Sequence, residues 1–242
     1  MKFQEYKRMY DREDWYWWYI AKRSYILTYL SSVRIRKSDN ILDIGCGTGK
    51  TTELLQQFGR VSAIDHSPLA VSYCHKRGLD YVRTGSVMNP KFPPKSQMLI
   101  TLFDVLYHKN VPDDLKALKN CHDLLKDGGY ILITDCACQF LFGPHDLANQ
   151  ARQRYTKGEL VKIIENAGFR TVRSSYIYFL TFPLFAAARV LDKLLPSSAV
   201  GEGTNNTFMN RCLITVCMIE NLFLRKISFP FGSSILVLAR KI

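Results

Sequence analysis

Ile41-Leu42-Asp43-Ile44-Gly45-Cys46-Gly47-Thr48-Gly49 is the stretch that decides the fold of this 242-residue chain. Its apolar start predicts a buried strand over 40–44, and the strand runs into a loop with glycine at every second position. Helix-forming residues follow, so we expect a glycine loop at 45–49 and a helix over about 50–58. Strand, glycine loop and helix in this order open the ligand site of a doubly wound α/β fold.

The glycine spacing narrows the class of ligand. The loop reads G-x-G-x-G, which differs from the G-x-G-x-x-G of dinucleotide-binding folds, and it lacks the G-K-[ST] of phosphate-binding loops. Glycine permits positive φ and lets a ligand approach the backbone closely. The loop therefore suits a ligand that has no phosphate groups to bind.

A second strand is predicted over 60–64, and it ends at Asp65. In folds of this kind an acidic residue at the end of the second strand binds ribose hydroxyls. A carboxylate can accept hydrogen bonds from both hydroxyls at once, so we favour this role for Asp65 over that of a simple turn residue.

The glycine loop resembles the first motif of class I S-adenosyl-L-methionine (SAM)-dependent methyltransferases. Asp104-Val105-Leu106-Tyr107-His108 and the run over 124–133 also resemble this family. Trp17-Trp18-Tyr19 followed by Ala21-Lys22-Arg23 is similar to a helix signature of a bacterial subgroup, the type 11 and type 12 methyltransferases. The resemblance covers about residues 12–240. It implies SAM as the cofactor and an α/β fold: a Rossmann-like, mostly parallel sheet of seven strands in the order 3-2-1-4-5-7-6, with helices on both faces.

The chain departs from the family pattern at several positions. Tyr16 stands where the subgroup has histidine, and Ser86 where the family commonly has an acidic residue that accepts from the adenine amino group. Met98, Tyr107 and Ala151 are further departures. They keep open the alternative of a SAM-binding protein without catalytic activity.

The remaining elements follow from periodicity and turn signals. Further strands are expected at 80–84, 98–103, 130–135, about 169–179 and 233–239, and helices at 12–34, 68–77, 113–125, 157–167 and 207–224, with a linker at 196–206. The length suits a single domain over 1–242. Within it we expect an N-terminal helical lid at 1–38, a SAM-binding core at 39–140 and an acceptor-side half at 141–242, with a helical insertion at about 182–225.

Composition leaves the partner open. The formal charge of +12 permits nucleic acid, an anionic membrane surface or an acidic substrate, but the basic residues are dispersed and no RNA-binding module is evident. An RNA methyltransferase therefore stays an alternative. The seven cysteines and the charged, aromatic first residues favour a cytoplasmic protein without disulfides, and the Cys136-x-Cys138 pair alone predicts no metal site.

The apolar run over 177–191 is too short to span a bilayer and is interrupted by Pro183, so we expect no transmembrane segment there. It predicts a buried helix, an apolar flap over an acceptor pocket, or a peripheral membrane contact. Together with the aromatic N-terminal helix it favours a small-molecule or amphiphilic acceptor of lipid, quinone or glycan type.

Two sets of site residues follow. The residues expected to bind the cofactor are Asp43, Gly45, Cys46, Gly47, Gly49, Asp65, His66, Ser86, Val87 and Phe103. Methyl transfer is an in-line displacement, and a base is needed only when the acceptor must lose a proton. The candidates for that catalytic role are His108, His145, Asp146 and Tyr155.

Overall fold

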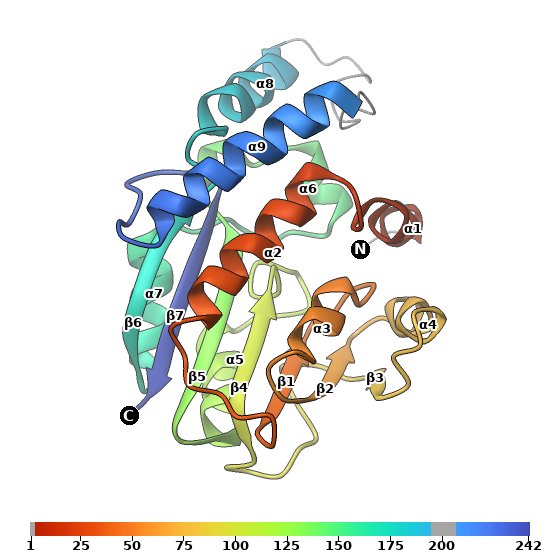
Figure 1. The fold of residues 1–242 in the computed structure, drawn as a ribbon, viewed down its shortest axis with the longest axis vertical. Helices are drawn as coiled ribbons and strands as arrows, with labels where there is room; N and C mark the ends of the chain where they lie inside the picture. Colours follow the sequence, from red (N-terminus) through yellow and green to blue (C-terminus); the bar gives the residue numbers. More distant parts are fainter. Residues whose placement is uncertain (1–2, 195–206) are drawn as a thin grey trace.

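The computed structural model describes residues 3–194 and 207–242, which form a seven-stranded sheet with helices on both faces (Figure 1). The strands are β1 (Asn40–Ile44), β2 (Arg60–Asp65), β3 (Val82–Thr84), β4 (Gln97–Phe103), β5 (Leu125–Cys136), β6 (Phe169–Ile177) and β7 (Ser234–Lys241). The helices are α1 (Phe3–Arg12), α2 (Trp17–Leu30), α3 (Lys50–Leu55), α4 (Pro68–Lys76), α5 (Asp114–Leu124), α6 (Pro144–Ala148), α7 (Lys157–Asn166), α8 (Phe182–Leu194) and α9 (Thr207–Leu224), with a 3-10 turn at Gln139–Leu141.

The strand order is β3-β2-β1-β4-β5-β7-β6, which confirms the predicted topology. Strands β1 to β5 run parallel to one another, whereas β7 is antiparallel to both β5 and β6. In the register, Ile44 of β1 lies opposite Ile64 of β2 and Leu102 of β4. The carboxyl ends of these three strands therefore meet at one edge, where ligands bind in open α/β sheets.

Alternating side chains of each strand build two separate cores. Leu42 and Ile44 of β1 belong to the buried cluster that includes residues of α5 and α7. Ile41, which precedes them, belongs to the cluster that includes residues of α2 and α9. Both faces of the sheet are thus covered, and α9 lies along α2 (Figure 1).

The prediction of one N-terminal helix over 12–34 is wrong. Helix α1 ends at Arg12, and α2 starts at Trp17 after Tyr16 takes an extended conformation with φ −78° and ψ 132°. The break lets Glu13 turn inward, where its carboxylate accepts a hydrogen bond from the Thr48 hydroxyl at 2.6 Å. No glycine or proline marks this break, so the sequence pattern gave no sign of it.

Other boundaries differ by a few residues. Strand β5 starts at Leu125 rather than 130, because a bulge around Gly128, where φ is +76°, lets the chain pair with Gln97 before the bulge and with Leu99 after it. The predicted linker at 196–206 lies outside the described residues.

Candidate active site

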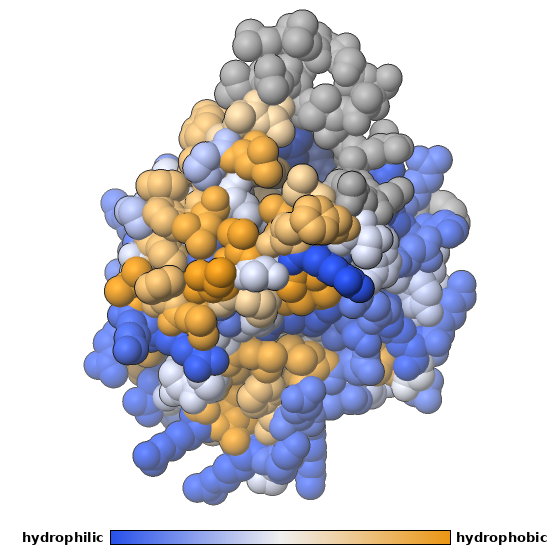
Figure 2. Space-filling view, turned by 45° about the horizontal axis from the view of Figure 1, so that its top comes forward, coloured by the Kyte–Doolittle hydropathy of each residue, from blue (hydrophilic) through white to orange (hydrophobic). Residues whose placement is uncertain are grey.

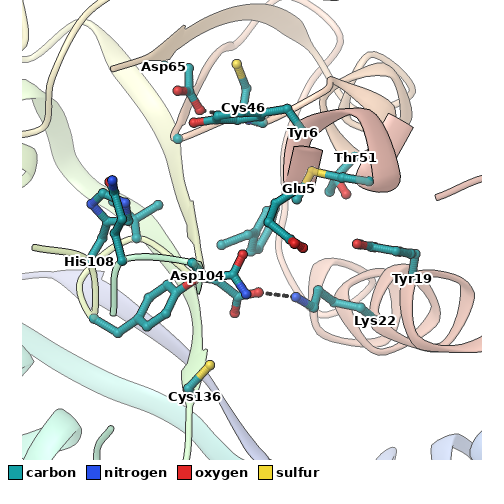
Figure 3. Close-up of a pocket in the computed structure, with 18 of the residues that line it drawn as sticks. Glu5, Tyr6, Tyr19, Lys22, Cys46, Thr51, Asp65, Asp104, His108 and Cys136 are labelled. Atoms are coloured by element: carbon teal, nitrogen blue, oxygen red, sulfur yellow. Dashed lines mark hydrogen bonds and ion pairs between the residues drawn. The ribbon is translucent and has the colours of Figure 1, made fainter. Parts of the chain in front are cut away.

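A cavity of about 820 Å3 opens at the carboxyl ends of the central strands (Figure 3). Its lining comes from α1, α2, the glycine loop, the ends of β2 and β4, and parts of α6 and α8. Chain segments that lie far apart in the sequence therefore share one space.

The glycine loop turns tightly at the end of β1. The backbone N–H groups of Gly45 and Cys46 donate to the carbonyl of Ile64, at 2.7 and 3.3 Å. Gly45 and Gly47 have φ of +77° and +57°, a region that favours glycine. A Cβ at Gly45 would also collide with the side chain of Val105, so this position has no room for a larger residue.

Asp65 fastens this loop. One carboxylate oxygen accepts from the N–H of Gly47 at 2.9 Å, and the other accepts from the N–H of Ser67 at 2.8 Å. Burial raises the pKa of Asp65, and the two N–H donors oppose that shift. Each oxygen has further acceptor capacity, so the carboxylate fits a pair of ribose hydroxyls.

Asp43 supports the loop from beneath. Its carboxylate accepts from the hydroxyls of Thr52 on α3, at 2.6 Å, and of Thr101 on β4, at 2.7 Å. The side chain is almost completely buried, and this desolvation raises its pKa to about 6. Asp43 therefore connects three elements under the site.

Most of the predicted cofactor residues line this cavity. They are Asp43, Gly45, Cys46, Gly47, Asp65, His66, Ser86, Val87 and Phe103. Gly49 is not among the lining residues: it caps α3 with φ +94°, and a Cβ there would crowd Leu79 and Cys74. The Ser86 hydroxyl accepts from the N–H of Met88 at 3.2 Å.

Helix α1 covers the glycine loop, and it lies within the segment 1–38 for which the sequence predicts a helical lid. The sulfur of Met9 lies 3.1 Å from where a Cβ of Gly47 would be. Tyr6 is buried near Asp65, and burial together with that carboxylate raises the pKa of Tyr6 to about 12. Tyr6, Met9, Tyr10 and Glu13 have i, i+3, i+4, i+7 spacing, a helical signal that was present in the sequence.

The opposite wall contains a partly buried ion pair between Lys22 of α2 and Asp104, which follows β4 (Figure 3). Asp104 has φ +58°, and its second oxygen accepts from the Thr134 hydroxyl at 3.1 Å. Glu5 of α1 reaches into the same space. The Lys22 ammonium also lies 5.7 Å from the centre of the Trp18 ring.

Of the four predicted catalytic residues, His108, His145 and Asp146 line the cavity. Desolvation lowers the pKa of His108 to about 4, and it lowers the pKa of His145 as well. The His108 Nδ1 accepts from the N–H of Asn110 at 3.1 Å. Both imidazoles are therefore neutral at pH 7.

The other two candidates are held by neighbouring side chains. Both oxygens of Asp146 accept from the guanidinium of Arg154, at 3.0 and 3.1 Å. The Tyr155 hydroxyl donates to Asp114 at 3.0 Å, and Tyr155 is not among the residues that line the cavity.

The comparisons with known proteins agree on one family. A sequence model described as a methyltransferase domain matches residues 17–174. The ubiquinone biosynthesis O-methyltransferase of Pseudomonas aeruginosa is 33% identical over 101 residues, which are 39% of this chain and 43% of that protein. The demethylmenaquinone methyltransferase of Staphylococcus epidermidis is 30% identical over 138 residues, 54% of this chain and 56% of that protein. The chain thus spans about half the length of the curated relatives that it matches.

A solved structure has the same fold. The phosphoethanolamine N-methyltransferase 2 of Haemonchus contortus, in complex with SAM, is 16% identical, with a TM-score of 0.58, and the match covers 90% of this chain and 52% of that one. The fold, the glycine loop with its carboxylate and the match over 17–174 agree with one another. This chain belongs to the methyltransferase-domain family of class I SAM-dependent methyltransferases, and SAM is its cofactor.

Proposed function

We propose that the protein transfers the methyl group of SAM to a small amphiphilic acceptor of the lipid or quinone type. One observation carries the proposal: a single cavity joins the cofactor wall around Asp65 to a second wall around Lys22, Asp104 and the aromatic residues of α2. In-line transfer requires both reactants to lie in one space from which water is excluded.

The cofactor wall has the donors and acceptors that the cofactor needs. Asp65 accepts from the ribose hydroxyls, the glycine loop lets the ligand approach the backbone, and Ser86 and Val87 border the adenine. SAM supplies a methyl group that its sulfonium already activates. The protein therefore has to align the acceptor and keep water out, and α1 closes the site over the glycine loop.

The acceptor wall combines apolar surface with one charged pair. Trp17, Trp18 and Phe185 line the cavity together with the ion pair of Lys22 and Asp104. An amphiphilic molecule matches this arrangement, with its polar group at the ion pair and its apolar part against the rings. The quinone methyltransferases among the relatives support this class of acceptor.

For a hydroxyl acceptor, we assign the proton-accepting role to His108 or His145, which are neutral at pH 7 and line the cavity. A base has to be unprotonated before it can accept a proton. Asp146 and Tyr155, bound by Arg154 and Asp114, are assigned to positioning this side of the site.

The test is incubation of the purified protein with methyl-labelled SAM and three acceptor pools: a lipid extract, a set of small phenols and quinols, and total RNA. The proposal predicts label in the lipid or the phenol fraction. Label confined to RNA would contradict it and favour the RNA alternative. SAM binding without transfer to any pool would favour a non-catalytic protein. His108→Ala and His145→Ala then show whether loss of either imidazole lowers kcat and removes its pH dependence.

A further inference from the structure

Three polar side chains of α9 face the protein, beside the buried Cys217 and Leu224. The Asn221 side chain accepts from the Thr28 hydroxyl at 2.9 Å and donates to the Ser24 hydroxyl at 2.6 Å. Asn210 bonds the backbone before and within α2, and the Glu220 carboxylate accepts from the N–H of Leu180 at 2.9 Å. Asn210, Glu220 and Asn221 are all buried.

The outward side of α9 is apolar. Phe208 is 76% exposed and Leu222 is 60% exposed, and Met209, Ile219 and Phe223 are exposed as well. Only 28% of this apolar helix is buried, although its length and composition are enough to cross a membrane. A helix that is apolar on its outer side is normally covered by protein or by lipid.

Neighbouring residues extend this surface, which we call the α9 patch. Figure 2 shows apolar residues gathered over the face that carries α8 and α9. Phe231 packs against Phe182 at the start of α8, with ring centres 5.3 Å apart. The patch consists of Leu180, Leu184, Phe208, Met209, Ile219, Leu222, Phe223, Ile227 and Phe231. A contiguous exposed apolar surface of this kind marks an interaction site.

The exposed charged residues on α9 and just after it are all basic. Arg211, Arg225 and Lys226 are exposed on α9 and just after it. The only acidic residue between 207 and 232 is Glu220, whose carboxylate is buried against Leu180. The whole chain carries a formal charge of +12. The partner of the patch should therefore be apolar and bear negative charge at its rim.

We propose that the α9 patch docks the protein on an anionic lipid bilayer, with α9 lying in the plane of the interface. Apolar side chains flanked by arginine and lysine are what an interfacial helix requires. A crossing orientation would remove Asn210, Glu220 and Asn221 from their partners and place them in hydrocarbon, which is costly. A second copy of the chain is a less suitable partner, because packing across a two-fold axis would bring the same basic groups close together and they would repel one another.

Docking would place lipid beside the cavity. Leu184 of α8 belongs to the α9 patch, while Phe185, Ala188 and Arg189 of the same helix line the cavity. Helix α8 is therefore the wall between the two. Only this consequence, the entry of an apolar acceptor from the membrane, rests on the proposed function; docking itself needs neither cofactor nor acceptor.

The test is sedimentation of the full chain with vesicles of phosphatidylcholine alone or mixed with phosphatidylglycerol, in the absence of SAM. We expect binding to the anionic vesicles that weakens as salt is added, because the basic groups contribute to it. Leu222→Ser with Phe223→Ser should weaken binding at least tenfold. The matched control, Leu115→Ser with Ile242→Ser, removes two other exposed apolar residues and should bind as the wild type does.

A second pair of variants tests the contribution of the basic residues to vesicle binding. Arg225→Gln with Lys226→Gln should lower the affinity for anionic vesicles several-fold, whereas Lys91→Gln with Lys119→Gln, also exposed, should change it much less. A polarity-sensitive dye on Cys212, the exposed cysteine among those of the described residues, should shift its emission to the blue on vesicles.

Several results would overturn the proposal. They are the absence of binding to either vesicle, an equal loss of binding in the patch variant and its control, or an unchanged dye emission on the vesicles. Dissociation of a dimer by the patch substitutions, without vesicle binding, would assign the patch to a second copy of the chain. Thermal unfolding of each variant shows that it is folded.

Discussion

At the scale of single residues, two aspartates near the ends of neighbouring strands make different contacts. Asp43 is enclosed by two threonine hydroxyls and is nearly inaccessible, whereas Asp65 caps the backbone of the glycine loop at the cavity wall. The sequence predicts both as cofactor residues, since each carboxylate lies at or near the end of an apolar strand. The structure distinguishes a carboxylate enclosed by two hydroxyls under the loop from one that bonds the loop backbone at the cavity wall.

Asp43→Asn should change how stability depends on pH. Burial raises the pKa of Asp43 from an ordinary value near 4 to about 6, so the folded state binds this proton more tightly than the unfolded chain. The stabilising contribution is full below about pH 4 and is lost as the pH rises through about 6. Relative to Asp43→Asn, the wild type should lose about 3 kcal/mol of unfolding free energy between pH 4 and pH 8.

Urea unfolding of both proteins across this pH range measures the difference. A difference that stays constant with pH would show that Asp43 titrates in the folded protein as it does in the unfolded chain.

Gly45→Ala should destabilise the protein by about 1–3 kcal/mol, because the new Cβ collides with Val105 and the backbone has positive φ. Thermal or urea unfolding measures the loss. Val105→Ala in the same chain should restore part of it, since only the collision is relieved. A Gly45→Ala protein as stable as the wild type would contradict the close contact between the glycine loop and the loop that contains Val105.

At the scale of elements, a buried carboxylate just after α1 helps to hold this helix over the glycine loop. Glu13 accepts from the Thr48 hydroxyl and from the Arg77 guanidinium, both at 2.6 Å, and so connects the end of α1 to the glycine loop and α4. By contrast, the ion pair between Lys7 and Asp11 on α1 is exposed.

Glu13→Ala should release α1 while the rest of the fold stays intact. Its loss leaves the Thr48 hydroxyl and part of the Arg77 guanidinium without their acceptor, at a cost of about 2–3 kcal/mol. Hydrogen exchange should speed up over 3–12 and remain unchanged over 17–30. The control Lys7→Ala, at an exposed pair, should leave the unfolding free energy nearly unchanged. Equal protection of α1 in both variants would contradict the lid.

Elements defined by local patterns could be predicted from the sequence, and contacts between distant segments could not. Strand β1, the glycine loop and the start of α3 follow from adjacent residues, and so does the face of α9 that contains Cys217, Glu220 and Leu224. The ion pair between Lys22 and Asp104 joins residues 82 positions apart, and the sequence next to either residue contains no signal that predicts it. The exposure of the apolar side of α9 could not be predicted from the sequence, because an apolar helix is normally expected to be buried.

At the scale of the whole molecule, the two faces of the sheet are covered by different helices. One face packs on α5 and α7 and supports the core, while the other is covered by α2 and α9 and adjoins the cavity. Helix α2, which lines the cavity with Trp17, Trp18 and Lys22, therefore packs directly against α9 and its patch. This arrangement is consistent with a protein that takes an apolar acceptor into a closed site beside a lipid surface.

The most direct test of the central claim is calorimetric titration of SAM into the wild type, Asp65→Asn and the control Asp80→Asn, an exposed aspartate outside the cavity lining. The account predicts saturable binding by the wild type and by the control. It predicts a Kd at least tenfold higher for Asp65→Asn, about 1.4 kcal/mol or more, because a charged acceptor for the ribose hydroxyls is lost. No binding by the folded wild type, or equal affinity of all three proteins, would contradict the assignment of this cavity to SAM.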